Sequence, residues 1–165
     1  MAVDMFLKID GVTGGTKNHS YKGWSDVNSY GWGMVSNRSS SSVTDNDTTS
    51  FKEISVSKKV GTDSTAIMLL YAQGKTIDFA ELKVIPITTK KSDKPKYLTL
   101  HMEDVLIKSI ITGGETSEDF FNEKIILLFS RVKYKYNAPV NLSVQATEEK
   151  VEYNFDWDIV NNKEL

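Results

Sequence analysis

The amino-acid sequence predicts a mainly β protein, in which long bent strands form a barrel or a tight two-sheet sandwich and one α-helix flanks them. Residues 151–159 give the clearest signal, because every second side chain is large and apolar: Val151, Tyr153, Phe155, Trp157 and Ile159. Successive side chains of a strand point to opposite faces, so this alternation indicates one apolar face and one acidic, solvated face. Similar alternation recurs along the chain, whereas a good helical pattern occurs only once.

The chain of 165 residues fits a single domain over 1–165, and its composition excludes several classes of function. A net charge of −2 gives no reason to expect nucleic acid as a partner. The absence of cysteine excludes disulfides and thiolate chemistry. Asp4 and Lys8 interrupt the apolar N-terminal segment, and no run approaches the roughly 20 apolar residues of a membrane span. We therefore expect neither a signal peptide nor membrane insertion.

The first sixty residues are predicted to form three strands and one polar loop. Residues 3–9 alternate as a strand that ends at glycines, and residues 23–35 form a second strand. Residues 36–49 are nearly all Ser, Asn, Asp and Thr, which indicates a surface loop. Residues 51–60 form the third strand, with Ile54, Val56 and Val60 on one side.

One helix follows, and it has recognisable start and stop signals. Thr62 or Asp63 can cap its N-terminus, and Gly74 lies where a helix C-terminus favours glycine. An apolar stripe runs between them, formed by Ile67, Leu70 and Tyr71.

Three further strands are predicted before the final one. Residues 76–88 form a strand in which Pro86 suggests an edge or a bulge. Residues 96–111 form a long strand whose apolar phase slips near Glu103 and Asp104, as expected for a bulge that bends the strand. Residues 123–136 form one strand, with a common apolar phase at Ile126, Leu128, Val132, Tyr134 and Tyr136. Residues 137–150 are a turn or a weak strand.

No set of residues has the spacing of a catalytic or metal site, so we predict a protein that is not an enzyme and has no cofactor. His19 and His101 are far apart in sequence, and neither lies in a ligand-spacing pattern. Glu103 and Asp104 are adjacent, so on a regular strand they face opposite ways. Asp156 and Asp158 share a face, where a solvated surface or a basic neighbour is a better interpretation than a cation site.

A basic stripe on the 123–136 strand is the main candidate for contacts between subunits. Its members are Arg131, Lys133 and Lys135. The tyrosines between them point the other way, so the stripe does not form a base-stacking platform for nucleic acid. The acidic face that includes Glu152, Asp156 and Asp158 is complementary to it, which would suit self-assembly of identical subunits.

The order and spacing of the sequence blocks resemble the Hcp (haemolysin-coregulated protein) family. The resemblance begins with the block Asp4–Gly11, continues with Tyr30–Gly33 and Phe51–Ile54, and includes Ala80–Val84. Its strongest block is Tyr97–Ile107 (YLTLHMEDVLI), and it ends with Phe129–Tyr136 and Trp157–Ile159. Together these blocks run from one end of the chain to the other.

The resemblance implies a two-sheet β-barrel with one flanking helix, assembled as homohexameric rings that stack into the inner tube of a bacterial type VI secretion system. It further implies sheath and spike proteins as partners and effector proteins carried in the lumen of the ring. The protein would lie in the bacterial cytoplasm before firing and then reach the medium or a target cell without a signal peptide. Ring stacking is expected to use two loops, at Asn37, Ser40, Asp45, Asp47, Thr48, Gly113, Gly114 and Glu115.

Two alternatives belong to other classes of protein. A free-standing barrel that binds a small ligand or a glycan would expose Trp24, Tyr30 and Trp32 in a pocket. A hydrolase would need two carboxylates about 5–9 Å apart in one cleft, and the sequence does not indicate such a pair.

Overall fold

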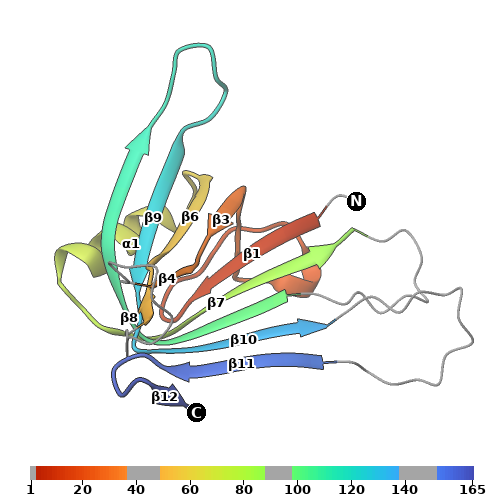
Figure 1. Ribbon diagram of the computed structural model, residues 1–165. Coiled ribbons are helices and arrows are strands. Elements are labelled where there is room, and N and C mark those ends of the chain that lie inside the picture. The colour runs from red at the N-terminus through yellow and green to blue at the C-terminus, as the bar shows by residue number, and fades with distance from the viewer. Residues whose placement is uncertain (1–2, 37–48, 88–97, 138–151) are drawn as a thin grey trace, which may run out of the picture.

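The computed structural model describes residues 3–36, 49–87, 98–137 and 152–165 (Figure 1). Within these ranges the chain is mainly β with one α-helix, which confirms the predicted class. The early strands are β1 (Val3–Ile9), β2 (Ser25–Asp26), β3 (Ser29–Gly31), β4 (Met34–Ser36), β5 (Thr49–Phe51) and β6 (Ile54–Lys59). The later strands are β7 (Ile77–Pro86), β8 (Leu98–Gly113), β9 (Asn122–Leu128), β10 (Arg131–Asn137), β11 (Glu152–Asp158) and β12 (Lys163–Glu164). The helices are the 3₁₀ turn η1 (His19–Tyr21) and α1 (Ser64–Ala72).

Strand β8 joins two groups of strands, because each half of it pairs with a different group. Its first half lies between β7 and β10 in the order β12-β11-β10-β8-β7-β1-β2. Its second half pairs with β9, which pairs with β6, which pairs with β3. Every one of these pairings is antiparallel. In Figure 1 the strand leaves the lower fan of strands and turns upward into the β8–β9 hairpin.

The turn of β8 occurs where the apolar phase slips, as the sequence predicts. Asp104 has a φ of 52°, a backbone conformation that bends the strand. Side chains are buried at even positions before the bend and at odd positions after it: Leu98, Leu100, Met102, Val105 and Ile107. A second irregularity, a register shift between Ile107 and Ser109, was not predicted.

The predicted strand over 23–35 is wrong, because this segment changes partner twice. β2 pairs with β1, and two residues later β3 pairs with β6. β4 then pairs with β5 in a separate ribbon. The predicted strand over 51–60 is likewise divided between β5 and β6. Alternation alone does not show which neighbour a strand has, so it does not reveal such breaks.

The predicted single strand over 123–136 is also wrong. It is two strands, β9 and β10, separated at Phe129 and Ser130. Ile125 and Leu127 are buried, rather than Ile126 and Leu128. The run from Ile125 to Phe129 is continuously apolar, so its sequence carries no information about phase.

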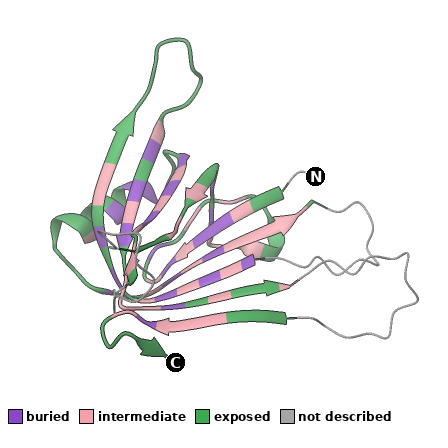
Figure 2. Ribbon diagram, viewed as in Figure 1, coloured by how far each residue is buried: buried purple, intermediate pink, exposed green. Residues whose placement is uncertain are grey.

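The core lies between the two groups of strands, and α1 packs against it (Figure 2). Ile67 is buried in the main cluster and Leu70 packs against it, as predicted, but Tyr71 is exposed. Asp63 occupies the N-cap position without making a side-chain cap bond. Gly74, with a φ of 61°, follows the helix in the left-handed conformation that favours glycine.

Candidate assembly surfaces

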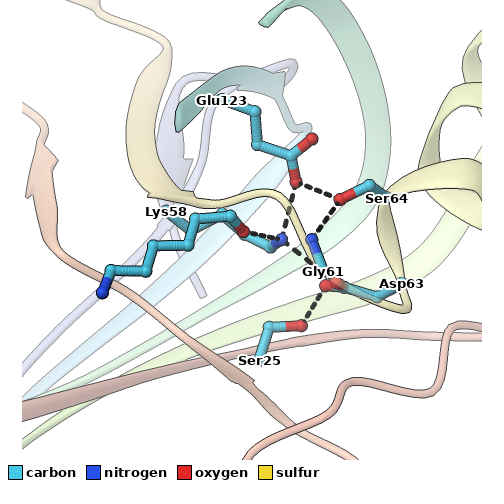
Figure 3. A network of polar contacts seen from close by, with 7 residues as sticks. Ser25, Lys58, Gly61, Asp63, Ser64 and Glu123 are labelled. Carbon is cyan, nitrogen blue, oxygen red and sulfur yellow. Dashed lines mark hydrogen bonds and ion pairs between the residues drawn. The ribbon is translucent and has the colours of Figure 1, made fainter. Parts of the chain in front are cut away.

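A buried cluster of charged groups lies where α1 begins (Figure 3). The Lys58 ammonium is 2.6 Å from Glu123 Oε1 and 3.0 Å from Asp63 Oδ1. It also donates to the Lys59 carbonyl at 2.8 Å. Ser64 Oγ donates to Glu123 Oε1 at 3.0 Å, and the Ser25 hydroxyl donates to Asp63. Side chains from β2, β6, β9 and the start of α1 are thereby joined in one network, which we call the buried ion cluster.

Sequence reasoning missed this cluster, although a signal was present. Ile54, Val56 and Lys58 occupy alternate positions of β6, and all three are buried. The prediction instead placed Val60 on this face, but β6 ends at Lys59 and Val60 is exposed. A lysine in the apolar phase of a strand is a signal for a buried partner, because a lone buried ammonium is strongly unfavourable.

The predicted basic stripe lies on the outer face of β10, between acidic positions of β8 and β11. Register places Arg131 opposite Glu103 and Asp158, and Lys133 opposite His101 and Asp156. The resulting ion pairs lie within one chain: Arg131–Glu103 at 3.0 Å, Arg131–Asp104 at 3.0 Å, Lys133–Glu103 at 3.3 Å and Lys135–Glu152 at 2.7 Å. The basic stripe and the acidic side chains that complement it therefore lie on neighbouring strands of the same subunit.

The acidic face of β11 is only partly solvated, which corrects the prediction at Asp158. This residue is buried, and its carboxylate accepts hydrogen bonds from the Asn161 backbone at 2.9 Å and the Asn161 amide at 2.8 Å. The side-chain and backbone bonds from Asn161 hold the pKa of Asp158 below its ordinary value. Asp158 thus fixes the turn between β11 and β12 in addition to its place beside Arg131.

We expect Asp158→Ala to lower the melting temperature at pH 7, with a difference from wild type that shrinks in acid. The pKa of Asp158 is lowered in the folded state, so its stabilisation is complete above the ordinary Asp pKa of about 3.9. It is lost as the pH falls further, through the lower pKa of the folded state. Thermal melts between pH 7 and pH 2 measure this, with Asp156→Ala as the control outside the Asn161 turn. A difference that stays constant down to pH 2 contradicts the assignment.

The predicted stacking residues Gly113, Gly114 and Glu115 lie where β8 ends and the β8–β9 hairpin turns. This turn is exposed and projects from the body of the molecule (Figures 1 and 2). A Cβ atom on Gly114 would meet the exposed Phe121 ring, which crosses the turn at that point. The other stacking candidates, Asn37, Ser40, Asp45, Asp47 and Thr48, lie outside the described residues.

The aromatic residues of the ligand-binding alternative pack against other side chains. Trp32 packs with Phe129, Tyr134 and Phe155 at ring-centroid distances of 6.0–6.5 Å, and its indole N–H donates to the Lys52 carbonyl. Tyr30 packs on the core, and burial raises the pKa of its phenol. Trp24 meets Tyr21 edge to face. None of the three aromatics lines the surface hollow beside Gly113, Glu118 and Lys124, or the one beside Phe6 and Tyr21.

The described residues contain no group of three or more histidine or carboxylate side chains placed to hold a metal ion. His19 is exposed in η1, whereas His101 lies on β8 with Nδ1 2.9 Å from Glu81 Oε2. In the same ranges, no helix has the length and apolar character required to cross a bilayer.

Comparison with known proteins identifies the family of this fold. The sequence model of the family described as "Type VI secretion system effector, Hcp" matches residues 6–136. Protein hcp1 of Pseudomonas aeruginosa is 27% identical over 143 residues, which cover 82% of this chain and 84% of that protein. Among solved structures, Hcp1 from Salmonella typhimurium has a TM-score of 0.77 at 23% identity, with both chains fully covered. A type VI secretion system effector from Yersinia pestis has a TM-score of 0.71 at 19% identity, covering 94% of this chain and 99% of that chain.

The matched segment runs from Phe6 in β1 to Tyr136 in β10 and includes α1, the β8–β9 hairpin and the basic stripe of β10. These matches define a structural component of the bacterial type VI secretion system that is not an enzyme. Within that system the chain belongs to the Hcp family, the secreted tube subunits and effector carriers. The predicted family is therefore confirmed.

Proposed function

We propose that this chain assembles into homohexameric rings, which stack into a tube and carry effector proteins in their lumen. The observation that carries the proposal is the continuous family match over residues 6–136, since Hcp proteins form hexameric rings in the secretion tube. A sheath around the tube and a spike at its tip are the other expected partners. The protein resides in the bacterial cytoplasm before firing and then reaches the medium or a target cell.

We infer that the strands of each subunit close into a barrel. The segment from β2 to β3 supports this, because it contacts both groups of strands. Val27 N donates to the Met5 carbonyl beside β2, and Asn28 N donates to the Ser57 carbonyl of β6. The cycle of strands then runs from β1 through this segment to β6, β9, β8 and β7, and back to β1.

Two surfaces are proposed to close the ring. The first is the charged face of β10 and β11, formed by Arg131, Lys133, Lys135 and Asp156, beside the turn that the buried Asp158 holds. The second is the outer side of α1, where Met68, Leu69 and Tyr71 are exposed on a helix without a charged residue. Methionine and aromatic residues are enriched, and charged residues depleted, at the centres of protein interfaces. The helix would therefore supply apolar area, and the charged face would set the register.

Stacking of rings is assigned to two loops. The turn at Gly113–Glu118 is one of them, because it lies at the end of a hairpin that projects from the body (Figure 1). The segment from Asn37 to Thr48, carried between β4 and β5, is the other.

The mass of the purified protein in solution tests ring formation directly. Light scattering is expected to give a particle of six times the 18.5 kDa chain mass. A particle that stays at 18.5 kDa at high concentration contradicts the proposal.

We expect Lys133→Glu to weaken the hexamer while leaving the fold intact. The side chain is exposed and its ion pair with Glu103 is on the surface, so its loss costs about 1 kcal/mol or less. Reversal of its charge changes the potential of the whole face, which neighbouring copies would meet. Native mass spectrometry measures the hexamer fraction, with the exposed Lys17→Glu as a control of equal charge. An unchanged hexamer fraction in Lys133→Glu rejects this face as a contact.

A further inference from the structure

The base of the β8–β9 hairpin is clamped to β6 by three contacts in succession. Lys58 pairs with Glu123, the residue opposite it in the strand register. The next lysine, Lys59, places its ammonium 3.8 Å from the centre of the Phe120 ring. Val60 N then donates to the Phe121 carbonyl at 2.9 Å. The hairpin therefore leaves the body at an angle that the end of β6 defines.

Glu123 links this clamp to the start of α1. Its Oε1 accepts both the Lys58 ammonium and the Ser64 hydroxyl, and Ser64 Oγ in turn accepts from Gly61 N at 2.9 Å (Figure 3). Asp63, at the N-cap position, directs its carboxylate to Lys58 instead of capping the helix. At the start of α1, Ser64 thus binds Glu123 of β9, and Asp63 binds Lys58 of β6.

The charges of the buried ion cluster indicate that it does not exist for stability alone. One ammonium faces two carboxylates, and Glu123 Oε2 is buried without a hydrogen-bond partner among the described residues. Apolar replacements of buried ion pairs are often neutral or stabilising, whereas fixed geometry is the advantage that such groups can provide. Of the two carboxylates, that of Glu123 accepts the hydrogen bond from the Ser64 hydroxyl of α1.

We propose that Glu123 is a positioning residue for assembly, which ties the β8–β9 hairpin to α1 and sets the angle between them. A small rotation at the base of a projecting hairpin becomes a larger displacement at its tip. The proposal rests on the proposed function, because the tip at Gly113–Glu118 and the outer side of α1 are both assigned there to contacts between copies. Both surfaces then reach their partners together only while Glu123 holds them.

The test compares Glu123→Leu with Glu123→Gln. Leucine removes the bonds from Lys58 and Ser64 to residue 123 but leaves Lys58 paired with Asp63. No buried charge is therefore left without a counter-charge. Glutamine keeps a carbonyl oxygen for Lys58 and Ser64. Hydrogen exchange of the hairpin amides is expected to be about 10 to 100 times faster in Glu123→Leu, the factor for loss of a charged hydrogen bond. The amides of the central part of β8 should be unchanged, and the hexamer fraction should fall in Glu123→Leu but not in Glu123→Gln.

Ser64→Ala provides the second variant, because it removes the bond between the helix and Glu123, together with the bond from Gly61 N, and keeps the Lys58–Glu123 pair. It is expected to raise exchange in both the hairpin and the first turn of α1. Wild-type hairpin protection and a wild-type hexamer fraction in Glu123→Leu overturn the inference, as does unchanged hairpin exchange in Ser64→Ala. Failure of the wild-type protein to form rings is a different result, since it rejects the proposed function itself.

Discussion

Replacement of Lys58 by methionine is expected to lower the free energy of unfolding by about 3–5 kcal/mol. The ammonium is the only cation in the buried ion cluster, and both Asp63 and Glu123 depend on it. Methionine fills most of the lysine volume, so the loss comes from two buried carboxylates without a counter-charge rather than from a cavity. Urea denaturation followed by circular dichroism measures the change.

Two further variants separate charge from packing in this result. Lys124→Met, at an exposed position of β9, is expected to change stability by no more than about 0.5 kcal/mol. The combined variant Lys58→Met, Asp63→Asn, Glu123→Gln carries no charge in the cluster and should recover most of the loss. A Lys58→Met protein as stable as the Lys124→Met control would show that the cluster is not buried as described.

Trp157→Ala is expected to cost about 3 kcal/mol, near the lower end of the range for large aromatic residues in cores. Trp157 is half-buried on β11, where its ring is stacked on Phe155 at 6.0 Å and lies 6.2 Å from Phe51. Loss of the ring therefore loosens the contact between β11 and the ribbon of β4 and β5. Thermal and urea unfolding measure the effect.

Tyr153→Ala is the matched control for Trp157→Ala, because both residues lie on the same face of β11. Tyr153 is 57% exposed and stacks only on Tyr136 among the ring contacts of the described chain. Its removal should cost about 1 kcal/mol or less. Equal losses in the two variants would contradict the placement of Trp157 at the margin of the core.

The sequence predicts the parts of this fold that depend on local pattern. Strand β1, the helix with Gly74 after it and the phase slip beside Asp104 each follow from alternation, spacing or a turn residue within a short window. The change of partner between β2 and β3 does not follow, because pairing is a long-range property. The break between β9 and β10 is hidden for another reason, since the apolar run at Ile125–Phe129 has no phase.

The sequence identifies the residues of the candidate surfaces, but it does not show which residues they contact. The charged stripe at Arg131, Lys133 and Lys135 is plain in the sequence, yet only the strand register shows that its partners lie on β8 and β11 of the same chain. The buried ion cluster brings together Lys58 and Glu123, which are 65 positions apart. No local signal connects two such residues, although a lysine in the apolar phase of β6 indicated that a partner was needed.

Electron microscopy of the purified wild-type protein shows directly whether copies of this chain form a ring. We expect annular particles with six-fold symmetry and an open centre, some of them stacked end to end. Single compact particles without a central opening, in a preparation whose circular dichroism shows the folded β protein, would contradict it.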